Sequence, residues 1–363
     1  MRVVIAPDSF GGTLSAVEAA QAIATGWRRK APDDDLMLVP MSDGGPGFVE
    51  VLHASLGGEP LSVTVPNQYG DQTDATVLMV EGTGYVESAQ ACGLSLTNRR
   101  DPEHATTCGV GQLGDAAIDA QARRIVVGLG GSGTNDGGAG FLSALGAAST
   151  PPNALAGGPG ALEGLEAVDL GPVLERCSGV EFVMASDVDN PLLGLRGATN
   201  VYGPQKGIAD DRLPEIDARL AKLADCTNPE LAKAKGAGAA GGLGFALLLV
   251  GASRVDGIGM VAAATRLAGL ARDADLVITG EGSFDFSTRS GKVPYGVAKI
   301  AGNSITPCIA LAGRVLVGSR EMRALGVESA YSLVDLVGEP AAFDAPAQSL
   351  TALAERVART WSR

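Results

Sequence analysis

The chain has 363 residues, a formal net charge of -13 at pH 7, 45% hydrophobic residues and 4% aromatic residues. This length allows two domains of ordinary size or one large α/β unit. The acidic balance argues against a nucleic-acid partner, because binding to a phosphate backbone relies on clustered Lys and Arg side chains. The 51 glycines and the scarcity of aromatic residues are typical of α/β enzymes with many strand-to-helix turns.

Neither the cysteines nor the apolar segments indicate an extracellular or membrane protein. The five cysteines are odd in number and form no C-x-x-C pair, which favours reduced thiols. No apolar run reaches the length of a membrane span, and no basic signal region precedes the apolar segment Val3-Val4-Ile5-Ala6. We therefore expect a cytoplasmic protein without a membrane partner. The sequence carries no signal for an oligomeric state.

The first part of the chain alternates between strand and helix patterns. A strand, Arg2–Ala6, precedes a polar loop and a helix, Ser15–Arg29, whose apolar residues recur at helical spacing. A second strand, Leu36–Pro40, again leads into a glycine-containing loop and a helix. This alternation predicts the opening of a parallel sheet.

The middle of the chain has a different pattern. Three β-rich runs separated by short turns predict an antiparallel meander: Leu61–Val65, Asp74–Val80 and Thr83–Ser88. Apolar strands typical of a parallel sheet return at Ile125–Gly128 and Glu181–Ala185. The intervening Pro-, Gly- and Ala-rich stretch Ser149–Gly164 is expected to be a surface excursion.

The last part returns to alternating helices and strands. The expected elements are helix Met260–Arg272, strands Asp275–Thr279, Pro307–Ala312 and Ser329–Leu333, and helix Pro346–Trp361. The simplest architecture is a doubly wound parallel-sheet domain formed by residues 1–61 and 246–363. A mixed α/β domain of residues 62–245, containing the meander, is inserted into it.

The segment from Arg123 to Gly140 is an apolar strand followed by a glycine loop, and a helix is expected after the loop. Glycines allow backbone N–H groups to approach an anion, and a helix N-terminus favours negative charge. Asp136, at the centre of the loop, would repel a bare phosphate. A divalent cation that links the carboxylate to a nucleotide phosphate resolves this conflict.

A dinucleotide site is the weaker alternative for the same loop. Gly128-x-Gly130-x-x-Gly133 matches the G-x-G-x-x-G pattern and follows a strand. However, the ribose-binding acid expected about 20 residues on is missing, because Ala147–Ala156 contains no Asp or Glu. A nicotinamide-dependent dehydrogenase is therefore disfavoured.

Six aspartates share one kind of position, each in a polar loop just after a predicted strand: Asp8, Asp43, Asp136, Asp187, Asp189 and Asp285. A single aspartate at such a place is commonly a turn residue or a helix cap. Ligands bind outside the carboxyl ends of parallel strands, and six aspartates there favour a cation site. The i, i+2 spacing of Asp187 and Asp189 suits a Mg²⁺ ligand and a general base.

Phosphoryl transfer also needs positive charge on the transferring group. Four basic residues stand close to the polar loops: Lys206, Arg289, Lys292 and Arg314. Lys206 is favoured, because it lies in a Gly/Pro turn, whereas a solvated lysine is an equal alternative for Lys292. A Walker P-loop is excluded, since Val293 follows Gly291-Lys292 where Ser or Thr is required. With two histidines in the chain, a hydrolytic triad and a zinc site are poorly supported.

Several longer motifs occur in order along nearly the whole chain. They are Val4–Phe10, Ser42-Asp43-Gly44-Gly45, Thr106-Thr107 with Gly109, Gly130-Gly131-Ser132 with Thr134-Asn135-Asp136-Gly137-Gly138, Asp187–Leu192, Gly203-Pro204-Gln205-Lys206-Gly207, Gly236–Gly244, and Thr279–Gly282 with Asp285, Ser290, Gly291 and Lys292. In these motifs the chain resembles the bacterial-type (type I) glycerate kinases, which phosphorylate D-glycerate with ATP.

The resemblance implies a flavodoxin-like domain interrupted by a second α/β domain, with the active site in the cleft between them. It implies ATP and Mg²⁺ as cofactors, with Asp136, Asp187 and Asp189 around the metal. Asp189 would orient or deprotonate the attacking hydroxyl, and Lys206 and Lys292 would stabilise the γ-phosphoryl charge. The residues expected to bind substrate or nucleotide are Asp8, Ser9, Asp43, Ser132, Thr134, Asn135, Glu281, Asp285 and Lys292.

The chain departs from the family pattern at two positions. Gly11 stands where the family usually has Lys, and Pro46 where it usually has Glu. Both lie in the first two strand-to-helix loops, so a different hydroxy acid or a catalytically weakened relative is the alternative. We expect 2-phosphoglycerate as the product, although the sequence does not decide between the two hydroxyls.

Overall fold

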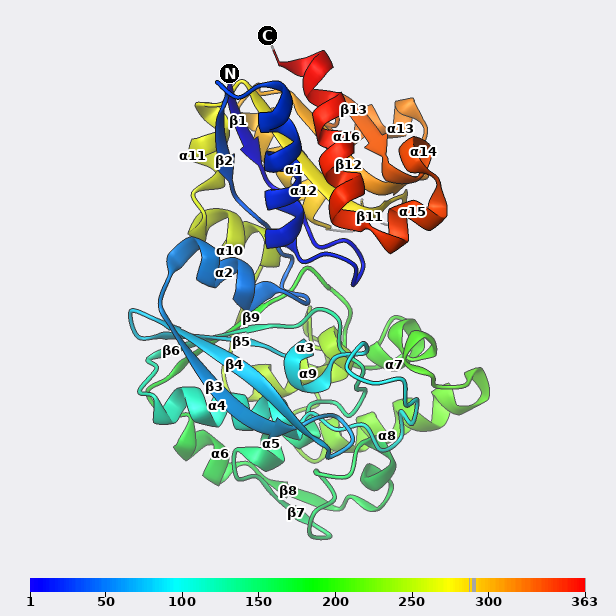
Figure 1. Cartoon of the computed structure of the whole chain (residues 1–363). Helices are drawn as coiled ribbons and strands as arrows, with labels where there is room; N and C mark the ends of the chain where they lie inside the picture. The colour runs from blue at the N-terminus through cyan, green and yellow to red at the C-terminus, as the bar shows by residue number, and fades with distance from the viewer. Residues whose placement is uncertain (287, 289–291, 363) are drawn as a thin grey trace. The chain divides into compact units, whose positions relative to one another are not determined.

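The computed structural model describes residues 1–286, 288 and 292–362, and the chain forms two compact α/β units (Figure 1). Unit 1 comprises residues 1–43, 50–56 and 258–363, and unit 2 comprises residues 44–49 and 57–257. Unit 2 extends beyond the predicted inserted domain, 62–245, at both ends. None of the helices in the described residues is long and apolar enough to cross a membrane.

Unit 1 contains a five-stranded parallel sheet. Its strands are β1 (Arg2–Ile5), β2 (Asp35–Leu38), β11 (Leu276–Phe284), β12 (Cys308–Val315) and β13 (Ser329–Ser332). They lie in the order β13-β12-β11-β1-β2, and every neighbouring pair is parallel. Within the unit this is the order 2-1-3-4-5 of flavodoxin-like sheets. The predicted doubly wound parallel sheet is confirmed.

Helices cover both faces of this sheet. They are α1 (Ala16–Lys30), α10 (Gly257–Ala264), α11 (Leu267–Arg272), α12 (Val293–Asn303), α13 (Ser319–Ala324), α14 (Leu333–Val337), α15 (Glu339–Asp344) and α16 (Pro346–Trp361), with most of α2 (Phe48–Leu56). Side chains of α1 and α16 form one core with β1, β11 and β12. Helix α12 packs against β11 and β12 outside that core. The single helix predicted over 260–272 is wrong, because Arg266 adopts φ 56° and separates α10 from α11.

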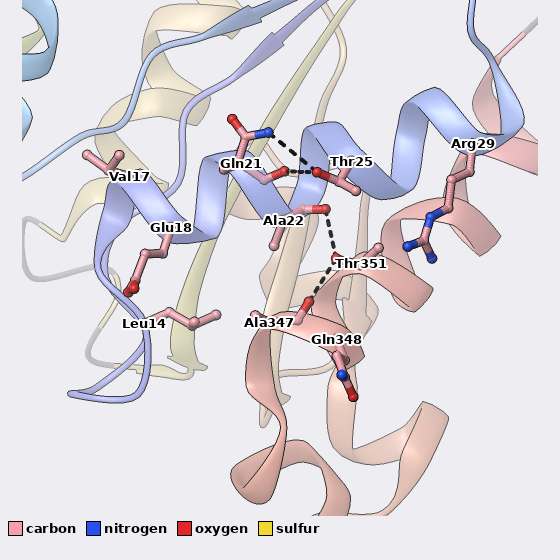
Figure 2. A pocket seen from close by; sticks show the side chains of 10 residues that line it. All are labelled: Leu14, Val17, Glu18, Gln21, Ala22, Thr25, Arg29, Ala347, Gln348 and Thr351. Atoms are coloured by element: carbon pink, nitrogen blue, oxygen red, sulfur yellow. Dashed lines mark hydrogen bonds between the residues drawn. The ribbon is translucent and has the colours of Figure 1, made fainter.

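Helix α1 lies against α16 along its length (Figures 1 and 2). Ser15 and Glu18 form a reciprocal capping box that fixes the start of α1. The two helices are in close contact at Gly26, where a Cβ atom would lie 2.0 Å from the carbonyl oxygen of Thr351. Thr351 Oγ1 also donates to the carbonyl of Ala22 at 3.2 Å. Beside this contact lies a groove of about 770 Å³, which no predicted site residue lines.

Unit 2 contains a six-stranded mixed sheet. Its strands are β3 (Glu59–Pro66), β4 (Gln72–Val80), β5 (Thr83–Glu87), β6 (Arg124–Gly128), β9 (Glu181–Ala185) and β10 (Ser253–Val255). Strands β3, β4 and β5 are antiparallel neighbours, which confirms the predicted meander. The sheet continues with parallel pairs from β5 to β6, β9 and β10. The loops that bear the predicted residues 132–136, and Asp187 with Asp189, follow the carboxyl ends of β6 and β9. Lys206 lies farther along the chain, in the 3-10 turn Pro204–Lys206.

The helices of unit 2 are α3 (Ala89–Cys92), α4 (Cys108–Asp119), α5 (Ala139–Ala144), α6 (Gly171–Arg176), α7 (Ala198–Tyr202), α8 (Leu213–Asp225) and α9 (Ala239–Leu249). The expectation of a surface excursion at 149–164 is wrong. Leu155 and Leu162 are buried against Leu220 and Leu223 of α8, and strands β7 (Ala148–Thr150) and β8 (Ala167–Asp169) flank the stretch as a pair.

The close approach at Gly26 predicts a stability effect. The substitution Gly26→Ala should destabilise the protein by about 1–3 kcal/mol, because the new methyl group overlaps backbone that cannot move away cheaply. Gly269→Ala, in helix α11 with open space around the glycine, is the matched control and should be neutral or slightly stabilising. Thermal and urea unfolding measure both. Equal midpoints for the two variants would contradict this account of the helix contact.

Candidate active site

The glycine loop after β6 is organised around the carboxylate of Asp136. Its Oδ2 accepts hydrogen bonds from the backbone N–H and the Oγ1 of Thr107, at 2.8 and 2.9 Å, and from Gly140 N–H at 3.1 Å. Its Oδ1 accepts from Gly138 N–H at 3.0 Å. The side chain is fully buried, and burial raises its pKa while these hydrogen bonds oppose the rise. Four protein donors therefore satisfy this buried carboxylate.

The same loop is packed from another side by the second glycine run. Gly241, with φ +66°, lies so close that a Cβ atom there would be 1.9 Å from the carbonyl oxygen of Thr134. Its own carbonyl accepts from Gly137 N–H at 3.0 Å. Asn135, also fully buried, donates from Nδ2 to Thr199 Oγ1 at 2.9 Å. Packing and hydrogen bonds from the second glycine run and from Thr199 therefore hold the backbone of this loop.

Lys206 is brought directly onto this loop. Its Nζ donates to Ser132 Oγ at 2.9 Å and to the carbonyl of Thr134 at 2.6 Å, and the side chain is 2% exposed. Burial lowers the pKa of Lys206 to about 8, and Cys92 and Asp136 oppose that change. Both hydrogen-bond partners are uncharged, so neither of them neutralises the ammonium.

Lys206 and Ser132 line one pocket of about 290 Å³. The rest of its wall is formed by Leu94, Leu129, Gly130, Gly131, Val188, Tyr202, Gln205 and Ala240. We call this cavity the lysine pocket. Its volume is close to the lower end of the range for small-molecule sites, and its charge suits a small anion. The predicted residues Ser132, Thr134 and Lys206 are therefore brought together, with Asn135 and Asp136 in the backbone that supports them.

The two aspartates after β9 have different partners. Asp187 accepts from Gly257 N–H at 3.2 Å. Asp189 is 60% exposed and pairs with Arg254 at 2.6 Å and with Lys235 at 3.4 Å. The charge of Arg254, and then that of Lys235, lowers the pKa of Asp189. Among the described residues no group of three or more His, Cys, Asp or Glu side chains is placed to hold a metal ion.

Unit 1 gathers another set of predicted residues after β1, after β2 and on β11. Burial and the nearby charge of Asp43 raise the pKa of Asp8 well above its usual value, and Glu281 adds to the effect. Glu281 is 4% exposed; it accepts from Thr288 Oγ1 at 2.6 Å and pairs with Lys292 Nζ at 3.4 Å. Lys292 is thus held by a carboxylate in this structure, in contrast to Lys206.

The remaining predicted residues of unit 1 have local roles. Ser9 donates its N–H to Asp8 Oδ1 at 2.7 Å, and Asp285 Oδ2 accepts from Ser283 Oγ at 3.1 Å. Arg289 lies outside the described residues. The expected location of the active site in a cleft between the domains stays a prediction.

The two positions that depart from the family pattern differ in their surroundings. Gly11 has φ +55°, and a Cβ atom there would meet nothing within 4 Å. A lysine in this conformation would be strained but not crowded. The ring of Pro46 lies in unit 2 against Gly131, whose Cβ atom would be 2.8 Å from it. Pro46 therefore packs on the wall of the lysine pocket.

Sequence patterns alone did not reveal all of these residues. Thr107 is fully buried and gives two hydrogen bonds to Asp136, yet only its place in a family motif singled it out. A threonine just before a helix was the available signal, since α4 begins at Cys108. Tyr202, which lines the lysine pocket and donates to Asn190 Oδ1 at 2.8 Å, carried no such signal.

Comparisons with known proteins agree over the whole chain. The model of the glycerate kinase family matches residues 3–362. Glycerate kinase of Bacillus subtilis (strain 168) is 41% identical over 92% of this chain and 90% of its own, and glycerate 2-kinase of Escherichia coli (strain K12) is 38% identical over 93% and 92%. The crystal structure of a putative glycerate kinase 2 from Salmonella typhimurium LT2 superposes with a TM-score of 0.81 at 37% identity, over 99% of this chain and 98% of that one. These matches overturn the dehydrogenase alternative, and the chain belongs to the glycerate kinase family.

Proposed function

We propose that this protein transfers the γ-phosphoryl group of ATP to the 2-hydroxyl of D-glycerate, giving 2-phosphoglycerate and ADP. The observation that carries the proposal is the family match over residues 3–362. The choice of the 2-hydroxyl follows the relative named glycerate 2-kinase. We also infer a cytoplasmic enzyme, since all five cysteines are free, as in reducing compartments.

The lysine pocket supports phosphoryl chemistry. The charge of a transferring phosphoryl group spreads over its equatorial oxygens, and catalysis is mainly positioning and electrostatic stabilisation. A buried ammonium whose hydrogen-bond partners are both neutral acts strongly on such a charge, because little water screens it. We assign this role to Lys206, with Ser132 and the 132–135 backbone holding the substrate beside it. Lys292, paired with Glu281, serves as the proposed second cation.

Mg²⁺ belongs to the proposal and fits some of the predicted ligands better than others. Asp136 does not fit, because its carboxylate is fully buried and occupied by four donors. Asp187 and Asp189 fit better, because neither side chain is fully buried. Mg²⁺ in kinase sites commonly uses one or two carboxylates together with substrate phosphates and water. Bound there with ATP, the ion would neutralise phosphate charge.

Asp189 is proposed to orient the attacking hydroxyl. Its lowered pKa keeps it ionised near neutral pH, so it accepts a hydrogen bond well but takes up a proton weakly. Orientation of the nucleophile is the larger requirement in a loose phosphoryl-transfer transition state. The predicted general base is therefore reinterpreted as an orienting carboxylate.

The reaction itself is tested by coupled detection of ADP. ADP should form with ATP, Mg²⁺ and D-glycerate together and not when any one is left out, and ³¹P and ¹³C NMR of the product should show phosphate on C2. A panel of small hydroxy acids tests the effect of Gly11 and Pro46. ADP formation with another acid alone would establish altered specificity, and no turnover with any acid would contradict the proposed function.

We expect the deprotonation of Lys206 to set the fall of kcat/KM at alkaline pH. Because burial lowers its pKa to about 8, the cationic form is lost as pH rises through that value, and kcat/KM should fall about tenfold per pH unit above it. Lys206→Met should lose roughly 10²-fold or more in kcat. Lys206→Arg, which stays charged, should lack this alkaline fall whatever its absolute rate. A profile that is flat to pH 10 in the wild type would refute the role.

We expect that removing the Asp189 carboxylate lowers the rate of the reaction without preventing the protein from folding. Asp189→Ala should lower kcat by roughly 10²-fold or more. Its stability should change little, since the side chain is 60% exposed and surface changes usually cost within about 0.5 kcal/mol. Asp211→Ala, an exposed aspartate of the same unit, is the control and should keep wild-type turnover. Wild-type turnover in folded Asp189→Ala would exclude Asp189 from the mechanism.

A further inference from the structure

We infer that Asp136 and Thr107 form a buried clamp that positions the Lys206 ammonium and stabilises its charge. The clamp acts through Lys206, so both members are positioning residues, and the inference rests on the proposed function for its effect on rate. It gives Asp136 a role other than the metal ligation expected from the sequence.

The hydrogen bonds of the clamp are all made between groups of the protein. Thr107 donates to Asp136 Oδ2 from both its backbone N–H and its Oγ1. The same Oγ1 accepts from the backbone N–H of Phe141 at 2.9 Å. The threonine hydroxyl thereby joins the start of α4 to the first turn of α5, on either side of the carboxylate. All three residues are fully buried, so water does not compete for these bonds.

The clamp fixes the two acceptors that hold the lysine. Ser132 and Thr134 lie four and two residues before Asp136 in the same loop, and they accept both hydrogen bonds of Lys206 Nζ. Gly138 and Gly140, which donate to Asp136, hold the other end of the loop. A change in the clamp should therefore move Nζ relative to a bound phosphoryl group, and displacements near 1 Å cost large factors in rate.

The clamp also supplies charge. Among the described titratable groups, Cys92 and then Asp136 oppose the lowering of the Lys206 pKa by burial. Burial raises the pKa of the Cys92 thiol to about 12, so this thiol is neutral at physiological pH. Four hydrogen-bond donors on its oxygens favour the ionised form of Asp136. Its negative charge then opposes the loss of the Lys206 proton. Its loss should lower the pKa of Lys206 further and bring the alkaline fall of kcat/KM to lower pH.

Two substitutions separate charge from geometry. Asp136→Asn removes the charge. The alkaline fall of its kcat/KM, here called the alkaline limb, should begin at a pH lower by roughly half a unit or more. Thr107→Val keeps the charge but removes both hydrogen bonds of the hydroxyl, the one to Asp136 and the one from Phe141. Its kcat should fall by roughly tenfold, with the alkaline limb near its wild-type position. Thr107→Ser restores the hydroxyl and should restore kcat. Asp217→Asn is the matched control, because Asp217 also accepts a backbone N–H in unit 2, from Gly194, and does not contribute to the pKa shift of Lys206. Its alkaline limb should not move.

The readouts are pH profiles of kcat and KM with ATP, Mg²⁺ and D-glycerate, and a titration of ¹³Cε-labelled lysine by NMR. Lys206→Arg identifies the Lys206 resonance, and this titration needs no turnover. An unshifted limb and resonance in Asp136→Asn, or Thr107→Val as active as Thr107→Ser, would overturn the clamp. If Asp136→Asn does not fold, the Thr107 pair decides alone. Absence of glycerate-dependent ADP from the wild type would refute the proposed function instead, and the resonance would still test the clamp.

Discussion

The buried carboxylate of Asp136 is the constraint on which the loop after β6 depends. A carboxylate without exposed surface is costly unless hydrogen bonds satisfy its oxygens. Here the loop, the start of α4 and the start of α5 each contribute donors, so these three segments cannot separate without exposing an unpaired charge. The arrangement converts a glycine-rich segment, which would otherwise be mobile, into a rigid support for Lys206.

Glycines make the dense packing around this support possible. A Cβ atom on Gly128 would lie 2.6 Å from the carbonyl oxygen of Gly44, and one on Gly130 would lie 2.5 Å from Gly45 Cα. Backbone therefore touches backbone where the Gly44–Val49 segment joins unit 2. Gly241 likewise leaves no room for a side chain, and it also has a positive φ. The glycine-rich composition reflects these contacts as much as any approach to phosphate.

Periodicity and turn chemistry predicted much of the fold. The meander and the terminal helix followed from alternation and helical spacing, and α16 has the predicted bounds, Pro346–Trp361. The break at Arg266 was missed because a positive φ in a non-glycine residue leaves no sequence pattern. The burial of Leu155 and Leu162 was missed because local composition does not report a partner as distant in sequence as α8.

The sequence likewise predicted some residues of the candidate site and missed others. Residue type and local position were enough to single out Asp136, in a loop after a strand, and Lys206, in a Gly/Pro turn. Their partners were not predictable from such rules, since they depend on tertiary contacts such as those of Thr107 and Arg254. Asp136 and Asp189 look alike in sequence, yet one is fully buried and the other is 60% exposed. A buried, saturated carboxylate supports a loop, whereas an exposed one paired with cations can exchange partners.

The charge of the protein gives Lys206 its significance. A net charge of -13 repels anions at long range, but salt screens that field over about 8–10 Å. Inside the lysine pocket the relevant charge is local: the ammonium is 2% exposed and its bonded partners are uncharged. Such a charge is worth more to an anion than an exposed lysine, because water screens it less. In the proposed mechanism, an acidic protein binds anionic substrates by keeping one lysine dry and protonated, and holding that proton is the part that we infer for Asp136.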